Sequence, residues 1–299
     1  MKRGVTNIAA SVRQRLLNES KRRGESFDYL AAVYARERFL ARLGISPHRN
    51  RLILKGASVF ALWFDIHRPT RDLDFLGVGH LDESEASRLA RDVCNAAIDD
   101  DGLRFEADSV EAEAIRDRDQ YRGIRLRLQA SLDAARIRLQ IDIGLGDVVT
   151  PAPALATLPV ILDDFAPPRV KVYPAETIVA EKLHAIVKLG IANSRMKDFF
   201  DLHLLAQREF NRELLASAVI RTFRRRKTPI EEKPFGLTAD FYADSAKQAQ
   251  WRAFLTRSGV DAPADFTAVG AVLRRFLLPV LRHARASRTA SSGGSGGAK

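Results

Sequence analysis

The sequence is poor in the residues that support several common classes of protein. Its one cysteine, Cys94, excludes an internal disulfide framework and any zinc site built on cysteines. No apolar run approaches the roughly 20 residues that a membrane-spanning helix needs. The first residues lead into a mixed polar stretch, which differs from the apolar core of a signal peptide. Together these absences predict a protein of the reducing cytoplasm.

What the sequence has in excess is positive charge. Its 299 residues include 48 Lys and Arg against 37 Asp and Glu, a formal net charge of +11. Hydrophobic residues make up 46% of the chain and charged residues 28%, which excludes a disordered tail or a repetitive fibre. The excess charge would attract phosphates, whether on a nucleic acid, a nucleotide or an anionic lipid. Charge alone does not rank these partners.

Hydrophobic patterning predicts an α/β fold (α+β), with a small mixed β-sheet core, flanking helices and a C-terminal helical domain. Residues 1–50 carry the 3.6-residue pattern of two helices, whereas residues 51–170 hold short apolar runs and alternating segments typical of strands. Residues 171–288 are almost wholly helical in character. Residues 289–299, rich in Ser and Gly, are expected to form a flexible tail.

The predicted elements have definite positions. In the core, strands are expected over Leu52–Leu54 and Asp72–Leu76, with a helical stretch over Val59–Ile66 between them. The alternating segments Phe105–Ala114, Gly123–Ser131 and Arg136–Ile143 suit antiparallel pairing. Helices in the C-terminal half are expected near residues 174–190, 196–207, 211–226, 238–258 and 264–286.

Asp72 and Asp74 are the first candidates for chemistry. One residue separates them on a predicted strand, so their side chains point to the same face, about 6.5–7 Å apart along the chain. Two such carboxylates can share a hard divalent cation, which prefers oxygen ligands. Taken alone, the pair is weak evidence, because most chance copies of Asp-x-Asp are solvated turns or helix caps.

The turn before this strand strengthens the metal interpretation. Gly56-Ala57-Ser58 joins an apolar strand to the predicted helix and offers backbone N–H groups and a hydroxyl. Such a turn is a natural cradle for phosphate oxygens. The order of strand, turn, helix and Asp-x-Asp strand would put the phosphate cradle beside the carboxylates.

Asp142 is a candidate third metal ligand. It lies on the polar face of the alternating segment Arg136–Ile143, whose apolar residues occupy the opposite face. The alternative is an ordinary polar face of an exposed strand. Three acids around a metal-bound triphosphate are the arrangement of two-metal nucleotidyl transfer.

These motifs resemble the polymerase-beta-like nucleotidyltransferase superfamily. Two segments of the helical half, Glu176–Ala185 and Arg195–Leu202, extend the resemblance to the AbiEii/AbiGii toxin family of nucleotidyltransferases, which are toxins of type IV toxin–antitoxin systems. The match runs from about Leu52 to Leu205 and depends on the order of the motifs. It implies NTP as substrate, Mg²⁺ or Mn²⁺ as cofactor and a cognate antitoxin as partner.

The resemblance also implies roles for residues of the helical half. Lys182 would contact the nucleotide phosphates, and one of Asp198 and Asp201, with Asp198 favoured, would belong to the active site. Arg71, directly before Asp72, could reach a phosphate or form a surface ion pair. The catalytic set expected is then Asp72, Asp74, Lys182 and Asp198, with Gly56, Ser58, Arg71 and Lys182 binding the nucleotide.

A basic cluster in the helical half, Arg224, Arg225, Arg226 and Lys227, suggests a polyanionic acceptor. The leading hypothesis is therefore a metal-dependent toxin that transfers NMP from NTP to RNA. The resemblance implies the 3′ end of tRNA as the acceptor and a block of translation as the result. One alternative is nucleotidylation of a small molecule or a protein. A second is a non-catalytic protein on a transferase fold that binds nucleic acid or a partner.

Overall fold

The computed structural model describes residues 7–64, 70, 72–116 and 122–293. Contacts between Cα atoms divide the chain into two compact units. The N-terminal unit comprises the described residues up to Gly146 together with Ala154–Val172, and the C-terminal unit comprises Asp147–Pro153 and the described residues from Tyr173 onward. Each has its own buried core and is considered by itself.

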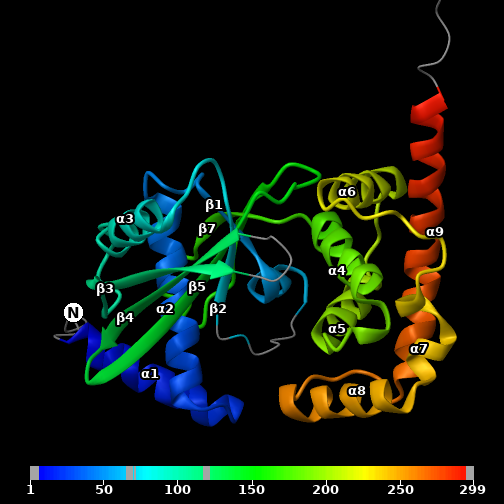
Figure 1. Ribbon diagram of the computed structural model, residues 1–299. Helices are drawn as coiled ribbons and strands as arrows, with labels where there is room; N and C mark the ends of the chain where they lie inside the picture. The colour runs from blue at the N-terminus through cyan, green and yellow to red at the C-terminus, as the bar shows by residue number, and fades with distance from the viewer. Residues whose placement is uncertain (1–6, 65–69, 71, 117–121, 294–299) are drawn as a thin grey trace, which may run out of the picture. The chain divides into compact units, whose positions relative to one another are not determined.

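The N-terminal unit contains a mixed seven-stranded sheet, as the sequence predicts in outline (Figure 1). Its strand order is β3-β4-β5-β2-β1-β7-β6. The β2–β5 and β1–β7 pairs are parallel, and the remaining neighbours are antiparallel. The strands are β1 (Leu52–Lys55), β2 (Asp72–Gly77), β3 (Leu103–Arg116), β4 (Arg122–Leu132), β5 (Ala135–Leu145), β6 (Ala154–Thr157) and β7 (Arg169–Val172).

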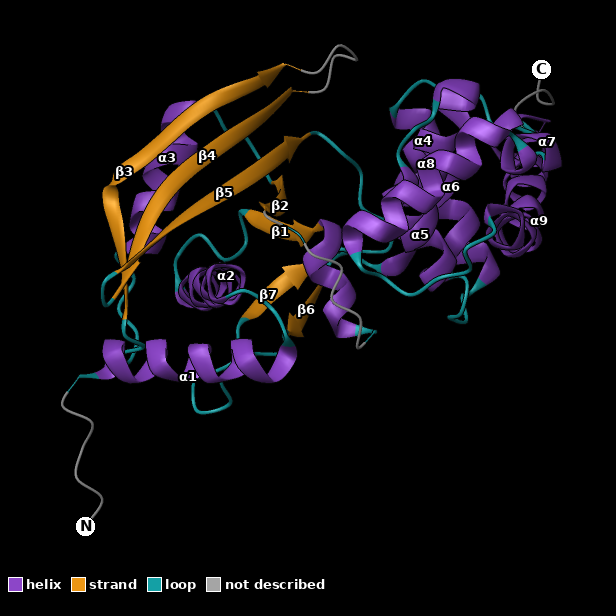
Figure 2. Cartoon of the chain, turned by 90° about the horizontal axis from the view of Figure 1, so that it is seen from below, coloured by secondary structure: helices purple, strands orange, loops and turns teal. Residues whose placement is uncertain are grey.

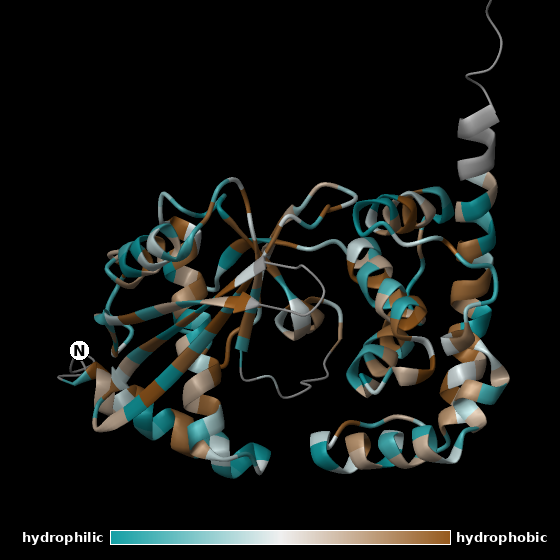
Figure 3. Ribbon diagram, in the orientation of Figure 1, coloured by the Kyte–Doolittle hydropathy of each residue, from teal (hydrophilic) through white to brown (hydrophobic). Residues whose placement is uncertain are grey.

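The long strands form because their apolar residues alternate with polar ones. On β5, Ile137, Leu139 and Ile141 are buried while Arg138 is exposed, as expected of a strand with one covered face. Figure 3 shows this alternation of apolar and polar residues along the strands. The buried rows of β3, β4 and β5 therefore fix which face of the sheet meets the helices.

Three helices of the same unit, α1 (Ile8–Arg23), α2 (Phe27–Ile45) and α3 (Glu83–Cys94), pack against the sheet. Figure 2 shows α1 and α2 on one side of strands β3 to β5. Each helix begins at a residue whose side chain accepts a hydrogen bond from a backbone N–H of the first turn: Asn7, Ser26 and Asp82. The two N-terminal helices thus belong to the unit that carries the sheet.

Between β1 and β2 the structure differs from the helix expected over Val59–Ile66. The segment Gly56–Leu62 forms a 3₁₀-helix instead, and residues 65–69 lie outside the described part of the chain. Such helices are tighter and shorter than α-helices. The turn that holds Ser58 is therefore the start of a 3₁₀-helix.

The C-terminal unit is helical, as predicted. Asp244 accepts a hydrogen bond from the backbone N–H of Lys247 and so starts a new helix, which divides the single helix expected over 238–258 into two. The last helix continues to Gly293, although a flexible tail was expected from residue 289. The helices are α4 (Ala175–Leu189), α5 (Met196–Leu205), α6 (Arg212–Arg225), α7 (Ala239–Ala243), α8 (Ser245–Ser258) and α9 (Phe266–Gly293), with short 3₁₀-helices at Gly190–Ala192 and Phe235–Leu237.

Aromatic residues from four helices form the core of this unit. Phe199 of α5 stacks on Phe241 of α7, and Trp251 of α8 stacks on Phe266 of α9, all fully buried. Packed aromatic pairs of this kind stabilise a core beyond the area that they bury. Across the described residues, none of the helices combines the length and the apolar character that crossing a membrane requires.

Candidate active site

Asp72 and Asp74 lie on β2, in the middle of the sheet. Because one residue separates them, both side chains project from the same face of the strand. β2 pairs with β1 on one side and with β5 on the other, so that Asp74 lies opposite Lys55 and beside Asp142. Neighbouring strands are about 4.8 Å apart. The three acids predicted from the sequence therefore share one face of one sheet.

The turn after β1 closes directly on Asp74. Gly56 has a φ of 71°, in the left-handed region that side-chain-bearing residues rarely adopt. A Cβ atom at this position would overlap the carboxylate of Asp74. Glycine is therefore needed here both for the backbone conformation and for the close approach of the turn to the acid.

Asp142 is held by an arginine that the sequence analysis did not single out. Arg125 lies opposite it on β4, and its Nε and one terminal nitrogen donate hydrogen bonds of 2.8 and 2.7 Å to the two carboxylate oxygens. This pairing raises the pKa of the Arg125 guanidinium above its ordinary value. The alternating pattern of β4 places Arg125 on the open face, but only the register between strands shows that it meets Asp142.

Ser58 lies at a small cavity of about 110 Å³ within the N-terminal unit. The same cavity is lined by Ala57 and by Arg36 of α2, which is 7% exposed and was also missed by the sequence analysis. Burial lowers the pKa of Arg36 below its ordinary value. An arginine in the middle of an amphipathic helix gives no sequence signal, whereas the fold places it beside the predicted phosphate turn. Arg71 lies outside the described residues.

Lys182, Asp198 and Asp201 form one cluster inside the C-terminal unit. Nζ of Lys182 donates hydrogen bonds of 2.9 Å to Oδ1 of Asp198 and 2.7 Å to Oδ2 of Asp201. Arg195 adds a second cation, with Nε 2.6 Å from Oδ2 of Asp198. The two carboxylates are 1% and 3% exposed and the lysine side chain 14%. Both aspartates, and not one alone, therefore contact the lysine.

The charges of this cluster stabilise one another. Burial alone would raise the pKa of Asp198, but the nearby positive charges of Lys182 and Arg195 outweigh it and hold that pKa below its ordinary value. Burial alone would lower the pKa of Lys182, and the two carboxylates more than offset this effect and raise it. Lys182 and Asp198 therefore remain charged at neutral pH, and the lysine already has carboxylate partners within its own unit.

Comparison with protein families identifies the chain. Residues 38–275 match the family described as nucleotidyl transferase AbiEii toxin, type IV toxin–antitoxin system. The chain belongs to the AbiEii family. The family and the fold make it a nucleotidyltransferase and a toxin of a toxin–antitoxin system, which implies an NTP as substrate and an antitoxin as partner.

The fold is similar to that of a solved structure. MenT4, a nucleotidyltransferase toxin from Mycobacterium tuberculosis, is 17% identical over 93% of this chain and 90% of its own, with a TM-score of 0.54. A putative nucleotidyltransferase from Helicobacter pylori is 18% identical over 87% of this chain and 98% of its own, with a TM-score of 0.49. A search among curated proteins finds no match to this chain.

The donor set of this AbiEii protein suits a hard divalent cation in part. Asp72 and Asp74 offer carboxylate oxygens from one face of β2. Because Gly56 has no Cβ atom, the turn can lie close to Asp74. The ligand atoms of Asp72, Asp74 and Asp142 do not all lie within 4.8 Å of one another. Among the described residues, one group of His, Cys, Asp or Glu side chains has three ligand atoms that all lie within 4.8 Å of one another. It consists of His80, Asp82 and Glu85, near the start of α3. Both carboxylate oxygens of Asp142 already accept hydrogen bonds from Arg125.

The basic cluster at the C-terminal end of α6 differs from the expectation at one residue. Arg226 is directed inward, with one terminal nitrogen 3.0 Å from Asp147 and 3.6 Å from Glu181. Its other terminal nitrogen lies 3.3 Å from Nδ1 of His184. These contacts commit its guanidinium to the C-terminal unit and leave it poorly placed to bind RNA. The other three residues of the cluster, Arg224, Arg225 and Lys227, are exposed.

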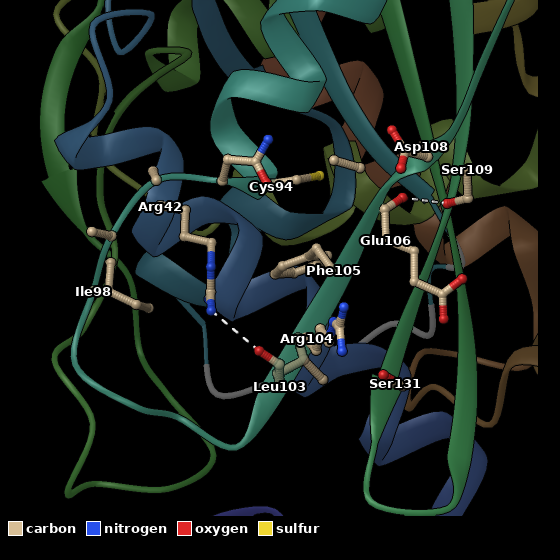
Figure 4. A pocket seen from close by; sticks show the side chains of 14 residues that line it. Arg42, Cys94, Ile98, Leu103, Arg104, Phe105, Glu106, Asp108, Ser109 and Ser131 are labelled. Atoms are coloured by element: carbon tan, nitrogen blue, oxygen red, sulfur yellow. Dashed lines mark hydrogen bonds between the residues drawn. The ribbon is translucent and has the colours of Figure 1, made fainter.

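A further hollow of the N-terminal unit lies away from the acids. It has a volume of about 790 Å³ and runs along the edge strand β3, with Cys94, Arg104 and Asp108 in its lining (Figure 4). Inside it, Arg42 donates a hydrogen bond of 3.3 Å to the carbonyl oxygen of Leu103. None of the predicted site residues lines this hollow, so its size does not mark the active site.

Proposed function

We propose that this AbiEii protein transfers NMP from an NTP to an RNA acceptor, most simply the 3′ end of tRNA, and thereby blocks translation. The observation that carries the proposal is the row formed by Lys55, Asp74 and Asp142 on adjacent strands, with Asp72 on the same face and the Gly56 turn against Asp74. Such a concentration of carboxylates beside a phosphate-binding turn suits nucleotidyl transfer. The excess charge of +11 favours a polyanionic acceptor over a small neutral one.

In the proposed reaction the 3′ oxygen of the acceptor attacks the α-phosphorus of the NTP. A new P–O bond forms, the bond to pyrophosphate breaks, and the acceptor proton leaves to solvent. Asp72 and Asp74, with Asp142 after release from Arg125, would hold Mg²⁺ or Mn²⁺ in a two-metal arrangement. When bound, these cations neutralise the triphosphate and lower the pKa of the attacking hydroxyl.

The chain's own groups would bind and orient the substrates. Backbone N–H groups of the Gly56 turn and the hydroxyl of Ser58 would hold phosphate oxygens, and Lys55 adds positive charge beside Asp74. Lys182 as a contact of the nucleotide and Asp198 as an active-site acid remain predictions from the family resemblance. Within their unit, the observed contacts of both residues are to each other and to neighbouring charged groups.

The test is transfer of label from each of the four NTPs to tRNA in Mg²⁺. We expect Asp74→Ala to lower transfer by about a hundredfold or more, because it removes a carboxylate from the centre of the charged row. Asp163→Ala, an exposed aspartate of the same unit, is the matched control and should retain activity. Circular dichroism would confirm that both variants are folded.

The outcomes separate the alternatives. Full transfer by Asp74→Ala would refute the assignment of the acids. If the wild-type protein labels a protein or a small molecule but no RNA, the acceptor is wrong while the chemistry stands. A wild-type protein that binds no NTP in Mg²⁺ or Mn²⁺ would instead be a non-catalytic binding protein.

A further inference from the structure

One face of the sheet is open to solvent and continues from the acids along three strands. Helices α1, α2 and α3 pack against the other face, where the apolar rows of β3, β4 and β5 are buried. Figure 2 shows α1 and α2 on one side of the long strands. The polar residues of the same strands, among them Arg127, Gln129 and Arg138, are exposed. The open face is therefore a surface and not an interior layer.

Strand register orders the charges on this face. In the row that contains Asp74, Asp142 on β5 meets Arg125 on β4, which lies opposite Glu113 on β3. Here the cations have partners: Arg125 binds Asp142, and Arg127 of the next row reaches Glu113 at 2.7 Å. The end of the face nearest the acids is thus close to neutral.

Further along the strands the face becomes basic. Arg138 lies opposite Gln129, which lies opposite the exposed Glu106 of β3, and the next row runs from Arg136 through Ser131 to Arg104 without an acid. All three arginines are exposed, and within the described residues none forms an ion pair with a carboxylate. Along β5, Arg138 is four residues and Arg136 six residues from Asp142, which corresponds to about 13 and 20 Å.

A hollow joins the acids to this basic end. It has a volume of about 480 Å³, and its polar lining consists of the carboxylates of Asp72 and Glu111 together with Arg127, Arg138, Gln129, Gln140 and Ser109. Guanidinium groups bind phosphate in two-point contacts, and side-chain amides bind sugar and base oxygens. The open face of β3 to β5 carries no aromatic side chain among its described residues, so it offers no platform for stacked bases.

We infer that the open face of β4 and β5 binds the sugar–phosphate backbone of the RNA acceptor, with Arg136 and Arg138 as its main phosphate contacts. The inference rests on the proposed function and adds where the acceptor lies. Since the contacts are to backbone, binding tolerates changes of RNA sequence. The acceptor strand runs along β5 toward Asp72, which brings its 3′ end to the acids.

The experiment measures binding of a fluorescein-labelled single-stranded RNA of mixed sequence, without NTP, over a series of salt concentrations. Three double variants of the full chain change the net charge equally: Arg136→Glu with Arg138→Glu on the sheet, Arg224→Glu with Lys227→Glu at the C-terminal end of α6, and Arg252→Glu with Arg257→Glu on α8. All six side chains are exposed, so each variant is expected to fold.

We expect the sheet variant to weaken binding at least about tenfold and to make the slope of log K against log salt shallower by about 1.4, since each lost phosphate contact on a single strand contributes about 0.7. The α8 variant should remain close to wild type. Equal loss in all three variants, or loss confined to the α6 variant, would overturn the inference.

Failure of the inference can be told apart from failure of the proposed function. Wild-type protein that labels RNA while the sheet variant still binds RNA normally refutes the open face as acceptor site and leaves the transfer reaction intact. Wild-type protein that neither binds nor labels RNA refutes the acceptor class itself.

Discussion

Gly56 is constrained by its left-handed backbone conformation and by its close approach to Asp74. Comparison with Gly24, which has only the first constraint, can separate the two effects. We predict that Gly56→Ala lowers transfer activity at least tenfold, because the new Cβ must displace the carboxylate of Asp74. Gly24→Ala has nearly the same φ, 69° against 71°, but nothing lies within 4 Å of its Cβ position. Each variant should lose about 1–2 kcal/mol of unfolding free energy from the left-handed conformation.

Label transfer and urea titration of both variants would test this. Gly24→Ala should be destabilised and active, whereas Gly56→Ala should be destabilised and inactive. Equal activity in the two would mean that the approach of the turn to Asp74 has no part in the reaction.

Glu37 on α2 gives a prediction about pH. Burial raises the pKa of its carboxyl from 4.5 to about 7, even though the backbone N–H of Ile161 donates a hydrogen bond to it. Between these two values the folded protein keeps a proton that the unfolded chain has released, so the stability from this group is present at low pH and is lost as the pH rises toward 7. The loss is about 1–3 kcal/mol.

Glu37→Gln removes the titration. Relative to wild type, the unfolding free energy of the variant should rise between pH 4.5 and pH 7, as measured by urea titration at several pH values. A constant difference between the two proteins across this range would show that Glu37 does not titrate abnormally.

At the scale of elements, α7 and α9 approach each other through a glycine. A Cβ on Gly270 of α9 would overlap the ring of Tyr242 on α7, and both residues are buried. We predict that Gly270→Ala destabilises the protein by about 1–3 kcal/mol, because overpacking a core forces shifts of side chains or backbone. Ala268→Ser, at an exposed position of the same helix, is the control and should change stability little.

Thermal unfolding of the two variants would decide the point. An unchanged or higher melting temperature for Gly270→Ala would show that α7 and α9 can separate without cost. That result would also remove the packing reason for a glycine at this position.

At the scale of the whole molecule, the chain holds two compact units, each with its own core. Lys182→Met leaves the carboxylates of Asp198 and Asp201 buried without their shared cation, a change that typically costs 3–5 kcal/mol. We predict that hydrogen exchange measured by mass spectrometry becomes faster in α4 and α5 and stays unchanged in β4 and β5. Units with separate cores can open independently.

A triple variant provides the control. Adding Asp198→Asn and Asp201→Asn to Lys182→Met removes the uncompensated charges and should restore part of the lost protection in α4 and α5. Equal acceleration of exchange in both units would contradict their independence, and no acceleration in either would contradict the structural role of the ion cluster.

The placement of Asp72 and Asp74 on one face could be predicted from the sequence because it depends on local spacing. The i and i+2 positions of Asp72 and Asp74 fix a common face on any strand, and the Gly-Ala-Ser turn precedes them at a short distance. The partner of Asp142 could not be predicted in the same way. Arg125 is 17 residues distant, and only the antiparallel register of β4 and β5 brings the two together.

The charged residues likewise divide into what the sequence predicts and what the fold decides. The sequence by itself determined the amount of positive charge, the order of the motifs and the periods of strand and helix, because each is a count or a short-range pattern. Tertiary structure decided which charges are accessible: Arg226 is bound by Asp147, 79 residues away, whereas Arg136 and Arg138 remain exposed on the sheet. The physical reason is that an ion pair forms only where folding brings opposite charges within a few ångströms, and strand order and helix packing set those distances.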